Sequence, residues 1–260
     1  MDQWQSSFSL GGLTLGRAAI LMSMVIVMSA CGSSTSDQQL VVSAAASLAG
    51  VFTEIEEAFE EANPGVDVEM NFAGSSRLKE QILEGAPVDV FASANAEAMT
   101  AVTAAILPDS VPQVFALNSL AIAVPAGNSA GVAGLDDFAD PQLFVGLCIA
   151  AVPCGQYAHQ TLRSAGVVPS VDSEEPDVRA LLLKIELGEL DLGIVYITDV
   201  IGAAGSVESA AIPSLHNTVA TYPIVSLAAG ENQAVADAFV AYVLSDMGRQ
   251  ILASYGFELP

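Results

Sequence analysis

Four residues stand where the sequence predicts that a strand or loop ends and a helix begins. They are Ser47, Ser75, Cys154 and Val178. A helix start leaves backbone N–H groups without partners and carries the positive end of the helix dipole. If several such starts converge, they form an anion site that needs no arginine. A single serine at a helix start is more simply explained as an N-cap, so this prediction depends on convergence.

A catalytic alternative comes from Ser76-Arg77-Leu78-Lys79, which matches the S-x-x-K pattern of penicillin-binding enzymes. Neither lysine beyond residue 31 begins a K-T-G triplet, and S-D-N is missing as well. The sequence also lacks an H-E-x-x-H motif, a Walker A loop and a G-x-G-x-x-G loop. These absences favour a binding protein over an enzyme, with Lys79 as a solvated helix residue.

Charge and composition exclude further classes of protein. The chain has 260 residues, with 7 Lys and Arg against 30 Asp and Glu and a formal net charge of -23. Nucleic acids and anionic membrane surfaces would repel such a chain. With 52% hydrophobic and 14% charged residues, the chain is expected to be globular.

The N-terminus is typical of an export signal. Arg17 precedes the apolar run 18–28, and small residues lead to Cys31. This arrangement resembles a bacterial lipoprotein box, which implies cleavage after residue 30 and a lipid on Cys31. Residues 31–38 then form a flexible tether. An uncleaved N-terminal membrane anchor is the alternative.

Cys148 and Cys154 are separated by five residues. In an exported protein a disulfide between them is the favoured interpretation. Two free thiols would be the alternative. A zinc site with His159 and His216 is disfavoured because Cys-x5-Cys is not a recognised zinc spacing.

Alternating strand and helix patterns predict an α/β protein with mainly parallel sheets. The rhythm changes near residue 125, where two strands follow one another, and helices close the chain. Two lobes are therefore expected: residues 39–124 with 219–260, and residues 125–218. A (β/α)8 barrel is disfavoured because it needs eight regular units.

Several motifs along the chain resemble the periplasmic molybdate-binding proteins of ABC transporters. They occur in the order of that family and cover essentially all of residues 38–260. The motifs are Ala44-Ala45-Ala46-Ser47-Leu48, Asn71-Phe72-Ala73-Gly74-Ser75-Ser76, Gly85-Ala86-Pro87-Val88-Asp89-Val90-Phe91, Val152-Pro153-Cys154-Gly155-Gln156-Tyr157, Asp177-Val178-Arg179, Gly193-Ile194-Val195-Tyr196 and Tyr255-Gly256-Phe257.

The resemblance implies a two-lobed type II periplasmic binding fold that closes on a tetrahedral dianion. It assigns anion contacts to the hydroxyls of Ser47, Ser75 and Tyr196 and to the N–H groups of Cys154 and Val178. Cys154 departs from the alanine that is common in the family, but a backbone contact tolerates that change.

The expected function is that of the extracytoplasmic binding component of an ABC importer for molybdate, and also tungstate. Its partners would be the oxyanion and a membrane permease, with no cofactor and molybdenum bound only as its oxyanion. A monomer attached to the membrane by its lipid alone is expected. A binder of sulfate or another oxyanion is the first alternative. A cell-envelope serine acyl-transfer enzyme is the second.

Overall fold

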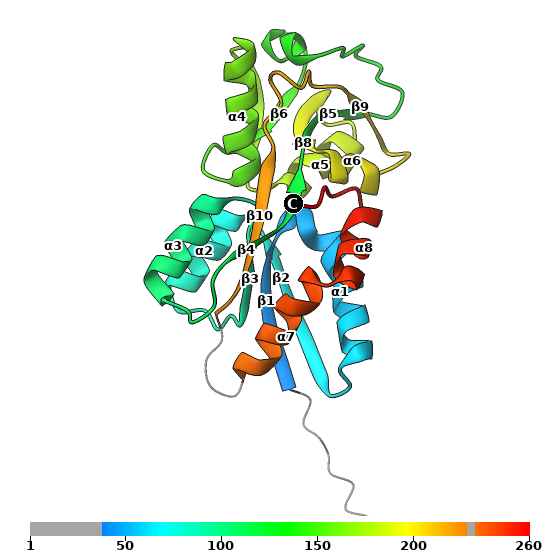
Figure 1. Cartoon of the computed structure of the whole chain (residues 1–260). Helices are drawn as coiled ribbons and strands as arrows, with labels where there is room; N and C mark the ends of the chain where they lie inside the picture. The colour runs from blue at the N-terminus through cyan, green and yellow to red at the C-terminus, as the bar shows by residue number, and fades with distance from the viewer. Residues whose placement is uncertain (1–37, 228–231) are drawn as a thin grey trace, which may run out of the picture. The chain divides into compact units, whose positions relative to one another are not determined.

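The structure is a computed structural model that describes residues 38–227 and 232–260. Two five-stranded sheets, each covered by helices, confirm the predicted α/β class (Figure 1). The predicted signal peptide and the lipidated Cys31 lie outside the described residues. Gln38, assigned above to the tether, is the first residue of a strand.

The first sheet is mixed. Its spatial order is β2 (Val66–Ala73), β1 (Gln38–Ala45), β3 (Val90–Ala92), β10 (Ala220–Ser226) and β4 (Gln113–Asn118). β1 is parallel to both of its neighbours, whereas β10 is antiparallel to both of its own. The helical segments of this lobe are η1 (Ala46–Leu48), α1 (Ala49–Ala62), α2 (Ser75–Leu83), α3 (Ala96–Ile106), α7 (Gln233–Leu244) and α8 (Asp246–Ser254).

The second sheet repeats this plan. Its spatial order is β7 (Val171–Glu175), β6 (Val145–Cys148), β8 (Leu192–Tyr196), β5 (Leu120–Pro125) and β9 (Val207–Ala210). β6 is parallel to β7 and β8, and β5 is antiparallel to β8 and β9. The helical segments here are η2 (Leu135–Ala139), α4 (Pro153–Ala165), α5 (Val178–Glu186) and α6 (Ile197–Gly202).

The chain passes from the first sheet to the second at Ser119, earlier than predicted. Residues 120–124 were assigned to the first lobe, but β5 pairs with β8 and β9 in the second sheet. The chain returns through residues 211–219, where Asn217 holds Leu120. Its side chain accepts from the N–H of Leu120 at 3.0 Å and donates to the carbonyl at 2.8 Å. The two crossing segments are therefore bonded to each other.

Aromatic side chains fill the core of the first lobe. Phe52 and Phe59 lie about two helical turns apart on the buried face of α1, and both contact Phe239 of α7, with ring centroids 6.2 and 5.1 Å away. Phe115 of β4 closes the cluster against Phe52 at 5.7 Å. Burying these rings is a major source of stability. It also fixes α1, and with it η1, the segment directly before α1 that carries Ser47.

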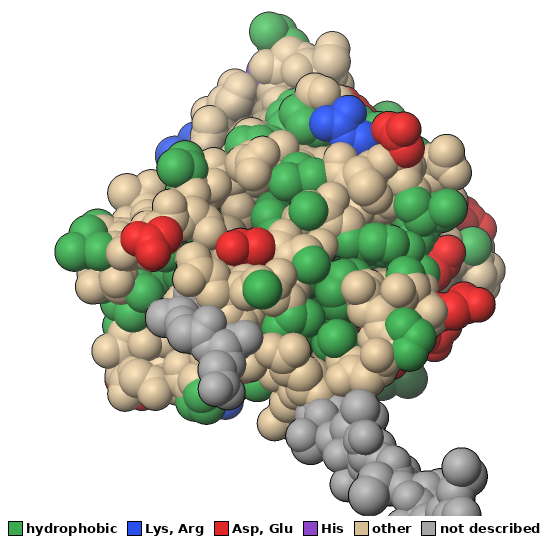
Figure 2. All heavy atoms as spheres, turned by 60° about the horizontal axis from the view of Figure 1, so that its bottom comes forward, with side chains coloured by type: hydrophobic (Ala, Val, Ile, Leu, Met, Phe, Trp, Pro, Cys, Tyr) green, Lys and Arg blue, Asp and Glu red, His purple; other side chains and the backbone are tan. Residues whose placement is uncertain are grey.

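The surface is acidic. Figure 2 shows Asp and Glu side chains spread over one face of the molecule, with few Lys or Arg side chains among them. Among the described residues, no helix has the length and apolar character needed to cross a membrane.

Candidate anion-binding site

One small cavity brings together all five predicted anion-binding residues. Ser47 and Ser75 come from the first lobe, and Cys154, Val178 and Tyr196 come from the second. The cavity volume is ≈ 10 Å³, far below the range of about 300–1,000 Å³ that is usual for organic ligands. The cavity is therefore too small for an organic ligand of ordinary size.

Helix starts surround the cavity, and most of them lack a side-chain cap. The N-cap residues of η1, α2 and α4 are Ala45, Gly74 and Val152, and none of them makes a capping bond. At α5, Asp177 accepts from the N–H groups of Arg179 and Ala180 but not from that of Val178. Unused N–H groups are thus concentrated at one point. The start of an α-helix carries roughly half a positive charge, so α2, α4 and α5 favour an anion at this point, and the Asp177 carboxylate offsets part of that effect.

Ser75 is oriented so that its hydroxyl can donate a hydrogen bond into the cavity. The side chain is 1% exposed, and its Oγ accepts from the N–H of Ala94 at 3.0 Å. Because the oxygen already accepts a bond from the protein, the hydroxyl proton is available to a group in the cavity. Ser75 is therefore placed as a hydrogen-bond donor.

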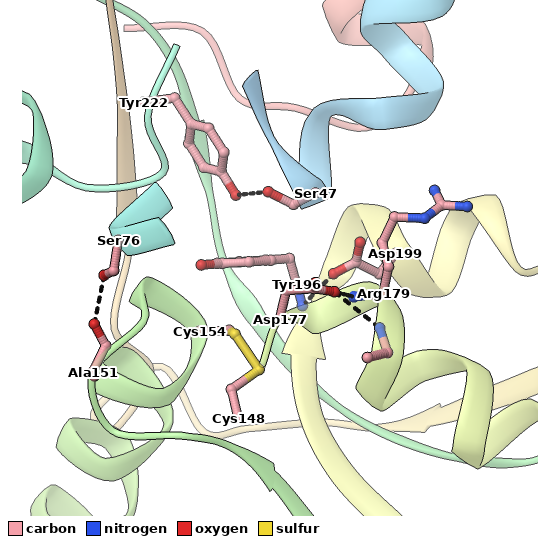
Figure 3. The surroundings of a disulfide bond; sticks show 11 residues. Ser47, Ser76, Cys148, Ala151, Cys154, Asp177, Arg179, Tyr196, Asp199 and Tyr222 are labelled. Atoms are coloured by element: carbon pink, nitrogen blue, oxygen red, sulfur yellow. Dashed lines mark hydrogen bonds between the residues drawn. A yellow bond between two sulfur atoms is a disulfide. The ribbon is translucent and has the colours of Figure 1, made fainter. Parts of the chain in front are cut away.

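Tyr196 brings a hydroxyl that has no partner. The side chain is 1% exposed, and among the described residues its Oη makes no hydrogen bond. Burial raises the pKa of this phenol well above its ordinary value, so it stays protonated. In Figure 3 the ring lies between the Cys148–Cys154 bridge and Ser47. An unpaired buried donor costs about 1–3 kcal/mol, which an acceptor in the cavity would recover.

The two lobes are joined by hydrogen bonds beside the cavity. Ser76 donates to the carbonyl of Ala151 at 2.5 Å, as Figure 3 shows. Asn95 donates to Gln156 Oε1 at 2.8 Å, and Gln156 donates to Glu97 at 3.1 Å. These side chains do not line the cavity, but their hydrogen bonds join the two lobes that form its walls.

Gly74 lies at a close approach of the two lobes. A Cβ atom at this position would lie 3.0 Å from the carbonyl oxygen of Pro176 and 3.3 Å from a methyl carbon of Val152. A larger residue would push the two walls apart, so glycine is needed here for packing rather than for an unusual backbone angle.

A wider groove beside the cavity holds the charged residues. Ser47 and Asp177 line both spaces, whereas Arg179 and Asp199 line only the groove. Asp199 accepts from the N–H of Tyr196 at 3.0 Å. Burial raises the pKa of this carboxyl to about 7, although the Tyr196 N–H and the Arg179 guanidinium both favour its ionised form. No Lys, Arg or His is found among the described residues that line the cavity.

The predicted disulfide is present. Cys148 ends β6 and Cys154 lies in the first turn of α4, with their Cα atoms 5.8 Å apart (Figure 3). Gly155 permits the tight loop, since a Cβ there would lie 2.0 Å from the carbonyl oxygen of Ile149. The bridge therefore fixes the loop that presents the N–H of Cys154.

The zinc alternative has no support in this geometry. Both cysteines are bonded to each other, and His216 lies 3.1 Å from Ser164 Oγ through its Nδ1. In the part of the chain that the structure describes, no three His, Cys, Asp or Glu side chains come close enough to hold a metal ion.

Sequence reasoning missed three residues around the site. Tyr222 lies 3.0 Å from Ser47, Asn118 lies behind Tyr222, and Gln156 joins the lobes. Gln156 occurs within one of the motifs quoted above, but its role depends on contacts with α3. Tyr222 precedes a proline in an unremarkable strand, and no local signal distinguishes it.

Comparisons with known proteins agree on one family. Residues 40–258 match the family described as bacterial extracellular solute-binding protein. The chain is 36% identical to the molybdate-binding protein ModA of Mycobacterium tuberculosis (strain ATCC 25618 / H37Rv), over 96% of this chain and 98% of that protein.

Solved structures show the same fold. The periplasmic molybdate-binding protein of Azotobacter vinelandii superposes with a TM-score of 0.72 at 20% identity, over 85% of this chain and 99% of that one. The sulfate-binding protein SubI of Mycobacterium tuberculosis H37Rv gives 0.75 at 17% identity, over 85% and 87%. The fold alone therefore does not distinguish the two ions.

We predict that the disulfide stabilises the fold modestly and the site locally. A seven-residue loop corresponds to about 2 kcal/mol in the chain-entropy relation. The Cys148→Ala/Cys154→Ala variant should lose about that much free energy of unfolding in urea. It should also bind anion a few-fold more weakly, because the N–H of Cys154 must then be ordered on binding. Two alkylated thiols in the non-reduced wild type, seen by mass spectrometry, would contradict the prediction.

We also predict that Asp199 lowers the free energy of unfolding as pH rises. Its folded pKa is about 7 against an ordinary 3.8, so between about pH 4 and 7 the unfolded chain has released a proton that the folded chain retains. This group therefore lowers stability as pH rises through that window. Asp199→Asn keeps an acceptor for Tyr196 and should gain stability relative to wild type from pH 4.5 to pH 7.5 in urea unfolding. An equal difference at both pH values would disprove this assignment.

Proposed function

We propose that this chain, which belongs to the bacterial extracellular solute-binding protein family, is the molybdate-binding component of an ABC importer. It takes up the oxyanion outside the cytoplasm and delivers it to a membrane permease. Tungstate, which has the same charge and shape, binds in the same place. The relatives named molybdate-binding protein support this ligand.

The observation that carries the proposal is the excess of donors in the cavity. The Tyr196 hydroxyl is buried without a partner, Ser75 offers a free proton, and the helix starts offer N–H groups. A fully deprotonated tetrahedral dianion accepts from all of them and donates to none. The site residues are Ser47, Ser75 and Tyr196 through their hydroxyls, and Cys154 and Val178 through their N–H groups.

Sulfate is the alternative within the same class. It has the charge and shape of molybdate and differs chiefly in size, so the same hydroxyl and N–H donors can bind both. The relatives with the higher identity are molybdate binders, whereas the sulfate-binding neighbour shares only the fold. Direct titration decides between the two ions.

The acyl-transfer alternative is less well supported. The Ser76 hydroxyl donates to the carbonyl of Ala151, and the relatives are transport proteins. Two further serine patterns occur in the chain, S-x-N at residues 93–95 and G-x-S-x-G at residues 127–131. Ser93 donates to the carbonyl of Asn95 within its own loop, and Ser129 is exposed in a turn after β5. Neither stands as an activated nucleophile.

We extend the proposal to location and assembly. The protein is exported, attached to the membrane by a lipid on Cys31, and monomeric, with no cofactor. Residues 1–30 act as the signal peptide. The acidic surface agrees with a partner other than nucleic acid.

A thermal-shift series tests the ligand. A ligand that binds only the native state stabilises it by RT ln(1 + [L]/Kd), so molybdate and tungstate should raise the melting temperature by several degrees at saturating concentration. Sulfate should raise it less, and phosphate should leave it unchanged. A larger shift with sulfate than with molybdate would select the alternative, and no shift with any of the four would reject the proposal.

Single hydroxyl deletions test the site. We expect Ser47→Ala, Ser75→Ala and Tyr196→Phe each to weaken molybdate binding about tenfold to a hundredfold in calorimetry, since each removes a charge-assisted hydrogen bond. Arg179→Gln, in the groove outside the cavity, serves as the control and should weaken binding less than Ser47→Ala. Full affinity in all three hydroxyl variants would reject this set of residues.

A further inference from the structure

A chain of three polar side chains crosses between the lobes beside the cavity. Asn95 directly precedes α3 and Glu97 lies in its first turn, whereas Gln156 lies in the first turn of α4 in the second lobe. Asn95 Nδ2 donates to Gln156 Oε1 at 2.8 Å, and Gln156 Nε2 donates to Glu97 Oε2 at 3.1 Å. Both ends of the Gln156 amide are therefore bonded to the opposite lobe.

The direction of each bond in this chain is fixed by the groups at its ends. Asn95 Oδ1 accepts from the N–H of Ala98, so the Nδ2 end of its amide faces Gln156. An ionised carboxylate only accepts, so Glu97 takes the Nε2 end of Gln156. The first lobe thus presents a donor and an acceptor close together, and the Gln156 amide matches both.

These bonds are not needed to build either lobe. Asn95 caps α3 through the N–H of Ala98, which belongs to its own lobe. The buried face of α4 is formed by other residues, among them Ala158 and Leu162, and Gln156 is only partly buried. The bonds of Gln156 therefore stabilise the contact between the lobes rather than the fold of either lobe.

Gln156 is firmly connected to the wall of the anion site. It lies two residues after Cys154, which the disulfide ties to Cys148, and its N–H donates to the carbonyl of Val152 at 2.9 Å. Val152 and Cys154 both line the cavity. A movement that carries this wall away from the first lobe therefore also breaks the bonds of Gln156.

Two neighbouring hydrogen bonds cross between the lobes as well. Ser76 donates to the carbonyl of Ala151, and Tyr157 donates to the carbonyl of Ala94. Their acceptors are neutral backbone groups, whereas Gln156 Nε2 donates to a carboxylate. Hydrogen bonds to ionised groups are roughly twice as strong as those between neutral groups. The charge of Glu97 therefore offers a way to change one interlobe bond without altering the others.

We propose that Asn95, Glu97 and Gln156 form a latch that sets how long a bound oxyanion stays in the cavity. An anion enclosed between the lobes leaves when the walls separate, and that separation breaks both bonds of the latch. The latch therefore slows dissociation without touching the anion, because none of its three residues lines the cavity. All three are positioning residues, and the inference rests on the proposed function.

Gln156→Glu breaks one bond of the latch with almost no change in shape. The new carboxylate still accepts from Asn95, but its second oxygen faces the carboxylate of Glu97, and like charges repel. Adding Glu97→Gln restores the bond in the opposite direction, because an amide at position 97 donates to a carboxylate at position 156. The double variant exchanges the two side chains and keeps the net charge of the chain.

The test measures how fast radiolabelled molybdate leaves the purified protein during a chase with excess unlabelled molybdate. Gln156→Glu should raise the dissociation rate about tenfold, because repulsion replaces a charge-assisted bond. Gln156→Glu/Glu97→Gln should return the rate to within about threefold of the wild type. As a control, Gln160→Glu adds the same charge one turn further along α4 and should change the rate less than about twofold.

The wild-type dissociation rate in Gln156→Glu would overturn the proposal, as would a fast rate that Glu97→Gln does not reverse. A second cycle gives an answer that does not depend on the folding of Gln156→Glu. Glu97→Ala should raise the dissociation rate several-fold in the wild-type background but not in a Gln156→Ala background. Equal increases in both backgrounds would show that Glu97 does not act through Gln156. Failure of the wild type to bind molybdate would instead reject the proposed function.

Discussion

The surplus of hydrogen-bond donors in one buried cavity is the constraint on which this molecule is built. Within residues 38–227 and 232–260, the helix starts without side-chain caps, the proton of Ser75 and the hydroxyl of Tyr196 have no acceptor. Unpaired buried donors are costly, so a folded chain retains them only where something else supplies the acceptor. A small dianion meets that need at many points at once. The two lobes, the disulfide and the aromatic cores serve to bring these donors together.

An acidic protein can bind an anion if the repulsion from its surface is screened and the attraction inside the cavity acts at contact distance. The net charge of -23 opposes the approach of any anion, but charges on the surface are screened over about 10 Å at moderate salt. Inside the cavity, helix starts and hydroxyl dipoles act at contact distance in a poorly screened environment. Short-range donors therefore control affinity, while the acidic surface disfavours nucleic acids and other polyanions. Arg179 lies outside the cavity, in the groove beside it.

In the second lobe, a disulfide bond adds to side-chain packing in fixing the segment that lines the site. The Cys148–Cys154 bridge fixes the start of α4, and Gly155 allows the carbonyl of Ile149 to pass close to that helix. Gln156 follows on the same turn and bonds to Asn95 and Glu97 of the first lobe. One short segment thus carries the N–H of Cys154 that lines the cavity and joins the lobes. Ordering it in advance reduces the entropy that binding must overcome.

The amino-acid sequence determined the helix starts, because their signals are local. Apolar periodicity and small residues placed Ser47, Ser75, Cys154 and Val178 at helix starts, and all four line one cavity. The α/β class and the disulfide partners followed from equally local patterns. Two edge strands, β7 and β9, were not predicted. Their sequences, VDSEE and VESA, are polar because one side of an edge strand is solvated, so the apolar signal is weak.

Only the tertiary structure decided which residues from distant parts of the chain meet. The lobe boundary at Ser119 depends on the pairing of β5 with β8, a choice between sheets that the apolar run 120–124 does not encode. Likewise, Tyr222 is 175 residues from Ser47, and Asn118 is 104 residues from Tyr222. The position of Ser47 at a helix start is local information, whereas its 3.0 Å contact with the Tyr222 hydroxyl depends on how distant segments pack. That contact is a property of the packed interior, since buried polar groups must find hydrogen-bond partners across the fold.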